Sequence, residues 1–84
     1  MTTKAYDIEP TYFGGFAENA VRDWYAKNGG PTQRRGFMVY QIIKDAHANV
    51  LELTTNYDDK RFVVTRDIYN DEIRMVVGNE TYTL

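Results

Sequence analysis

The sequence of 84 residues contains no cysteine and no serine, and only one histidine, His47. Without cysteine, neither a disulfide nor a thiolate metal site can form, and we expect a reducing compartment, the cytoplasm. Serine and cysteine nucleophiles are excluded, and a threonine nucleophile would need an adjacent base or a free N-terminal threonine. His47 lies between two alanines in a predicted turn and has no companion at ligand spacing. The residues therefore predict a protein that is not an enzyme and binds neither a metal nor a cofactor.

Long apolar runs and a large excess of either charge are also missing. No segment approaches the length needed to cross a bilayer, and the first residues lack the apolar stretch of a secretory signal, so we expect a soluble protein. Ten basic and twelve acidic residues give a formal net charge of −2. That balance is far from the basic charge of a dedicated nucleic-acid binder. The length predicts a single domain, residues 1–84.

Hydrophobic patterning divides the chain into three parts. Residues 1–15 are predicted to form an irregular arm, because a proline and the pair Gly14-Gly15 interrupt regular structure. Residues 16–28 are predicted to form a helix, since apolar side chains recur at spacings of three and four and a Gly-Gly-Pro stop follows. Residues 37–84 are predicted to form an antiparallel sheet. The expected fold is α+β, with one helix packed on a four- to five-stranded antiparallel meander in two layers.

The segment 37–48 fits two periodicities. Its apolar residues can be placed on one face of a helix, but Met38, Tyr40 and Ile42 alternate as in a strand. A polar, turn-like break at 45–49 separates this segment from the next apolar run. We predict that this segment and the next apolar run form two antiparallel strands, in which Tyr40 faces Leu53.

A hairpin at Arg61–Val77 sets the register of the predicted sheet. Asn70 and Asp71 tolerate the positive φ of a tight two-residue turn, and Ile68 then faces Ile73 on the core side. Continued through the sheet, this register also places Arg66 on the core side. There it would extend to an edge or pair with a carboxylate such as Glu80.

The second face of the predicted sheet is too apolar to lie wholly in water. Its apolar members are Phe37, Val39, Ile43, Val50, Val63 and Val76. Because a single helix cannot cover both faces, either the arm at 1–15 lies over the second face or another chain contacts it. That chain would be a second copy, giving a homodimer, or a different protein.

No motif in the sequence identifies a family. Small, cysteine-free, aromatic-rich and mildly acidic domains are common among phage and mobile-element proteins that bind and inhibit host machinery, and the chain is similar to them in this general character only. We therefore expect a non-enzymatic protein-binding module that inhibits or modulates a larger host protein. Aromatic side chains that we expect to be exposed, together with acidic and basic side chains, are predicted to contact this partner. They are Tyr25, Arg34, Arg35, Tyr57, Asp58, Asp59 and Arg66.

The alternative function is a nucleic-acid-binding accessory protein. It would use two basic pairs, Arg34-Arg35 and Lys60-Arg61, to contact phosphates. This alternative is less expected because acidic residues lie between the basic ones. An enzyme working through carboxylates would need Glu52 or Asp67 in a cleft, for which so small a domain has little room.

Overall fold

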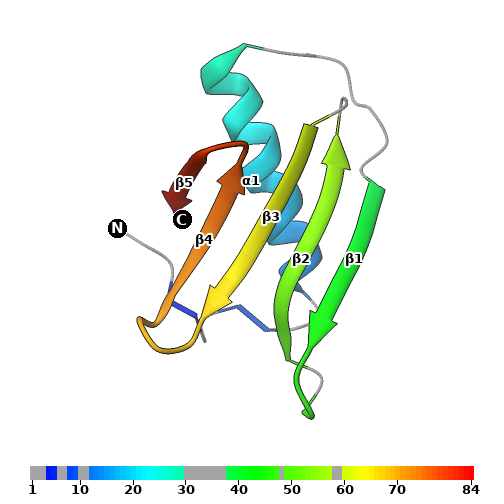
Figure 1. Cartoon of the computed structure of the whole chain (residues 1–84), viewed down its shortest axis with the longest axis vertical. Coiled ribbons are helices and arrows are strands. Elements are labelled where there is room, and N and C mark those ends of the chain that lie inside the picture. The colour runs from blue at the N-terminus through cyan, green and yellow to red at the C-terminus, as the bar shows by residue number, and fades with distance from the viewer. Residues whose placement is uncertain (1–3, 6–7, 10–11, 30–37, 48, 58–59) are drawn as a thin grey trace.

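A computed structural model (Figure 1) shows one α-helix packed on a five-stranded antiparallel sheet, which confirms the predicted α+β fold. It describes residues 4–5, 8–9, 12–29, 38–47, 49–57 and 60–84, with the backbone alone at 38–40. The elements are α1 (Phe13–Asn28), β1 (Met38–Lys44), β2 (Val50–Tyr57), β3 (Lys60–Asp67), β4 (Glu72–Val77) and β5 (Glu80–Thr83). The strands lie side by side in chain order, so β1 and β5 form the two edges of the sheet. The segment 38–44 is thus a strand, as predicted.

Helix α1 begins earlier than the sequence predicts. Phe13 is its first residue, and Gly14 and Gly15 belong to its first turn instead of ending the arm. Phe13 is fully buried, with the guanidinium of Arg66 5.1 Å from its ring centroid. Burial of this ring outweighs the low helix propensity of two glycines. The end of the helix is as predicted, since Gly29 follows Asn28 with a φ of 77°.

The core lies between one face of the sheet and the inner stripe of α1. In Figure 1 the helix crosses behind the middle strands. Ala17, Val21 and Tyr25 are buried at one-turn spacing along the helix, and Trp24 and Tyr25 contact the ring of Phe62 at 5.5 and 5.6 Å between centroids. No helix in the described part of the chain is long and apolar enough to cross a membrane.

The β3–β4 hairpin forms with a register two residues away from the predicted one. Ile73 faces Arg66 instead of Ile68. Because side chains alternate between the faces with a period of two, an even shift leaves each strand residue on its predicted face. Ile68 is the exception: it moves out of the strand into the turn, where it is 43% exposed.

The side chain of Asp67 explains the longer turn. Its Oδ1 accepts hydrogen bonds from the backbone N–H groups of Tyr69 and Asn70, both at 3.1 Å, and its Oδ2 accepts one from Asn70 Nδ2 at 2.9 Å. Asp71 then adopts a φ of 52° before β4 begins. An aspartate that bonds the backbone two and three residues ahead closes a wider turn than the predicted Asn70-Asp71 pair.

The other strand pairs are partly as predicted. Leu53 faces Val64 in β3, as expected, but faces Ile42 in β1 instead of Tyr40. The β1–β2 ladder has register shifts at Val39/Gln41 and at Ile43/Lys44, and the second of these lies between the turn and the Ile42–Leu53 pair. Val50, predicted on the second face, is buried in the core, because the register shift at Ile43/Lys44 leaves Leu51 without a partner in β1 and changes the alternation of faces at the start of β2.

The described part of the arm lies on the helix side of the sheet and not over the second face. Arg66 is only 5% exposed, and its Nη1 and Nη2 donate hydrogen bonds to the carbonyls of Ala5 and Ile8, the latter at 2.8 Å. The backbone N–H of Ala5 donates to Asp71 Oδ1 at 3.1 Å. Arg66 is on the core side, as predicted. Glu80, its predicted partner, instead accepts a hydrogen bond from Tyr82.

We predict that Arg66→Met lowers the free energy of unfolding by about 2–4 kcal/mol, because it removes the buried donors of the carbonyls of Ala5 and Ile8. The matched control is Arg74→Met. Arg74 lies on the second face, is 38% exposed, and forms ion pairs with Asp67 and Glu72. Its loss should cost at most about 1 kcal/mol. Urea unfolding measures both, and equal losses would contradict the anchoring role of Arg66.

A second prediction concerns acid. The hydrogen bonds from the Asn70 side chain and backbone lower the pKa of Asp67 below its ordinary value of 3.8. Because the pKa of Asp67 is lower in the folded state than the ordinary 3.8, its ionisation stabilises the fold fully above about pH 3.8. This stabilisation is lost as the pH falls through the pKa of the folded state. Carboxyl NMR titration should therefore find Asp67 ionised below pH 3.8, and Asn70→Ala should return its pKa toward 3.8. An unchanged pKa in the Asn70→Ala variant would show that this turn is not held as described.

Candidate functional site

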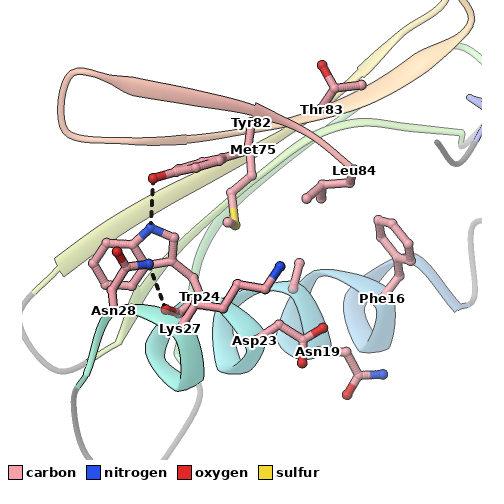
Figure 2. Close-up of a pocket in the computed structure, with 11 residues that line it drawn as sticks. Phe16, Asn19, Asp23, Trp24, Lys27, Asn28, Met75, Tyr82, Thr83 and Leu84 are labelled. Atoms are coloured by element: carbon pink, nitrogen blue, oxygen red, sulfur yellow. Dashed lines mark hydrogen bonds between the residues drawn. The ribbon is translucent and has the colours of Figure 1, made fainter. Parts of the chain in front are cut away.

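A groove lies between α1 and β5 (Figure 2), at the sheet edge opposite β1. Its volume is about 360 Å³, which is within the range of sites that bind ligand groups. One wall is the flank of α1, and the other is β5 with the residue that follows it. The lining residues are Phe16, Asn19, Ala20, Asp23, Trp24, Lys27, Asn28, Met75, Tyr82, Thr83 and Leu84.

The groove exists because α1 carries a second apolar stripe beside its buried one. Phe16, Ala20 and Trp24 follow each other at intervals of four, so they lie on one flank, and all three are half-buried. The small side chain of Ala20 leaves a space between the two aromatic rings. Met75 of β4, which is buried, projects toward this space in Figure 2.

Two aromatic side chains meet at one end of the groove. Trp24 Nε1 donates a hydrogen bond to the hydroxyl of Tyr82 at 3.4 Å, and this hydroxyl donates to Glu80 Oε2 at 2.5 Å. The bond to the Glu80 carboxylate raises the pKa of Tyr82 above its ordinary 10.0. The ring of Trp24 also contacts a cation, since Lys60 Nζ lies 5.8 Å from its centroid. These contacts hold the indole and the phenol in fixed positions.

The rim of the groove is polar. Asn19, Asp23 and Lys27 are exposed on α1, and Asn28 Nδ2 donates to the carbonyl of Trp24 at 2.9 Å. An apolar floor with a polar rim is the usual anatomy of a surface that recognises another protein. Within the described residues, no group of three or more histidine and acidic side chains is placed to hold a metal ion.

Two of the predicted contact residues are not on the surface. Tyr25 and Tyr57 are only 5% and 3% exposed, so the expectation that they are exposed is wrong. The hydroxyl of Tyr25 donates to the carbonyl of Tyr57 at 2.8 Å, and the guanidinium of Arg22 lies 5.5 Å from the Tyr57 ring centroid. Tyr25 lies on the inner stripe of α1 and Tyr57 at the end of β2, where the helix covers the sheet.

The remaining predicted residues are not brought together by the described part of the structure. Arg66 is buried against the arm. The predicted contacts Arg34, Arg35, Asp58 and Asp59 lie outside the described residues. Lys60 and Arg61 are exposed at the start of β3, as a phosphate contact would need.

The sequence contained a signal for the groove. In the sequence, Phe16, Ala20 and Trp24 form one apolar stripe with Ala17 and Val21, at spacings of three and four. That combined stripe is wider than the contact one helix makes with a sheet, which indicates that part of it stays open.

The hydrogen bond between Tyr82 and Glu80 can be tested by titration. We predict that Glu80→Gln lowers the pKa of Tyr82, because a neutral amide stabilises the protonated phenol less than a carboxylate does. NMR of tyrosine labelled at the ring carbon measures this value. Glu72→Gln, at the opposite end of the β4–β5 hairpin, is the control and should leave it unchanged. A pKa of Tyr82 that Glu80→Gln leaves in place would contradict the contact.

Neither a model of a protein family, nor a curated protein, nor a solved structure matches this chain. Support for a function therefore comes from the residues and contacts described above.

Proposed function

We propose that this protein is a non-enzymatic protein-binding module that inhibits or modulates a larger partner in the cytoplasm, and that it contacts this partner through the groove between α1 and β5. The observation that supports the proposal is the half-buried pair Trp24 and Tyr82 beside an apolar space. Tryptophan and tyrosine are enriched among residues that dominate binding energy at protein interfaces.

An apolar side chain of a partner fills the groove more favourably than water does. Phe16, Ala20 and Leu84 leave apolar surface facing the space, and water there makes few hydrogen bonds. A partner that fills the space with an apolar group removes this surface from water, at about 25 cal/mol per Å² buried. The exposed Asp23 and Lys27 at the rim can remain hydrated or pair with the partner.

The second face of the sheet offers less for binding than the sequence predicts. Val50 lies in the core, and Val63 and Val76 are half-buried. Of the members whose side chains the structure describes, Ile43 is the one that is exposed, at 40%. Arg74 lies across this face in ion pairs with Asp67 and Glu72. A homodimer through this face therefore has less support than binding at the groove.

We expect affinity capture to identify a partner. The protein, immobilised through a tag, is exposed to a lysate of the cells that produce it, and proteins that bind specifically are identified by mass spectrometry. The purified partner is then titrated calorimetrically. Ala20→Phe, which fills the groove, should weaken binding at least about tenfold, equivalent to about 1.4 kcal/mol.

Val63→Phe is the matched control, because it introduces the same phenyl side chain on the second face of the sheet. Circular dichroism establishes that both variants are folded. If Val63→Phe abolishes binding and Ala20→Phe does not, the proposed surface is wrong. If no protein is captured and the chain turns over a metabolite, the proposed function is wrong.

A further inference from the structure

Strand β5 is an edge strand with a regular ladder. It follows β4 through the two-residue turn Gly78-Asn79, in which Gly78 has a φ of 59°, and Val77 faces Glu80 across that turn. In a two-residue hairpin the flanking pair is hydrogen-bonded, and the hydrogen-bonded pairs then recur at every second residue.

This alternation decides which backbone groups of β5 point outward. Glu80, Tyr82 and Leu84 bond to β4, as the 2.8 Å bond from Leu84 N to the carbonyl of Ile73 shows directly. The N–H and C=O groups of Thr81 and Thr83 therefore point away from the sheet. Both threonines are exposed, and in the described part of the chain neither backbone takes part in a hydrogen bond outside the ladder.

The open edge borders the groove. Tyr82 and Leu84 project toward α1 and line the groove, whereas Thr81 lies on the second face opposite Val76. Residues that face each other in neighbouring strands have side chains on the same face. A strand added to β5 would thus place every second side chain beside Tyr82 and Leu84, over the space at Ala20.

We propose that β5 and the groove together bind an extended peptide segment of a partner protein as a sixth strand. The segment bonds to the N–H and C=O groups of Thr81 and Thr83 and inserts apolar side chains from alternate positions into the groove. Strand addition of this kind takes affinity from the main chain and specificity from alternate side chains. This inference rests on the proposed function and specifies how the partner is recognised.

The β1 edge is less suitable for strand addition, and a second copy of the chain is a less suitable occupant of the groove. The other edge, β1, has register shifts at Val39/Gln41 and at Ile43/Lys44, and such irregularities bend an edge away from added strands. A second copy of the chain would add a β5 strand whose groove-side residues are Tyr82 and Leu84. Its Tyr82 is already hydrogen-bonded to Trp24 and Glu80 of its own chain, so this side chain is not free to fill the groove of another copy.

The test begins with a phage-displayed library of random linear peptides selected on the folded full-length protein. We expect enriched sequences with apolar residues at alternate positions. Synthetic versions are titrated calorimetrically against variants. Thr83→Pro removes an outward N–H without removing a ladder bond, and proline is tolerated at such edge positions. It should weaken binding at least about tenfold.

Thr83→Val is the matched control, since it keeps the N–H and the β-branched shape, and it should bind within about twofold of the wild type. Hydrogen exchange gives an independent result: the bound peptide should protect the amides of Thr81 and Thr83 and leave the already bonded amide of Tyr82 little changed. Circular dichroism checks that each variant is folded.

Several outcomes would overturn the inference. These are no enrichment of any peptide, binding that Thr83→Pro leaves intact, or light scattering that shows a dimer dissolved by Thr83→Pro, which would make the occupant a second copy. Failure here differs from failure of the proposed function. A captured partner whose binding is lost in Ala20→Phe but kept in Thr83→Pro would leave the function supported and strand addition refuted.

Discussion

The buried guanidinium of Arg66 connects three parts of the chain that are distant in sequence. It extends from β3 to the carbonyls of Ala5 and Ile8 in the arm and lies over the ring of Phe13 at the start of α1. A buried charge without hydrogen-bond partners costs several kcal/mol, so the arm has to stay in place once this residue is enclosed. The same contacts fix where the helix begins. The position of α1 on the sheet therefore depends on a charged residue inside a mostly apolar layer.

The position of α1 also determines what remains uncovered. Ala17 and Val21 are fully buried on the stripe that meets the middle strands, whereas Phe16, Ala20 and Trp24 on the neighbouring stripe are only half-buried. One helix is too narrow to cover five strands, and the apolar surface it leaves lies next to β5. The groove and the open edge are consequences of this single mismatch in width. A second helix over β5 would have removed both.

Periodicity was sufficient to predict the layers of the fold but not the details that make the site. Alternation placed Val64 and Arg66 on the correct face even though the register was two residues off, because a shift by two preserves the faces. Hydrogen bonds decided the length of the turn, because the carboxylate of Asp67 bonds to Tyr69 and Asn70. The burial of Tyr25 was within reach of the pattern, since Tyr25 continues the one-turn spacing of Ala17 and Val21. The groove depends on where the helix lies relative to the last strand, and no single segment of the sequence encodes that.

Trp24 is the only tryptophan in the sequence, and it forms one wall of the groove. Its ring lies edge-on to Tyr25 and Phe62 in the core, while its Nε1 bonds to Tyr82 at the surface. The tryptophan emission of the protein therefore originates from one indole between the packed interior and the open space. Replacing water beside this indole with an apolar group would shift its emission to shorter wavelength, whereas unfolding would shift it to longer wavelength. The domain thus contains an unlabelled optical reporter that separates occupancy of the groove from loss of structure.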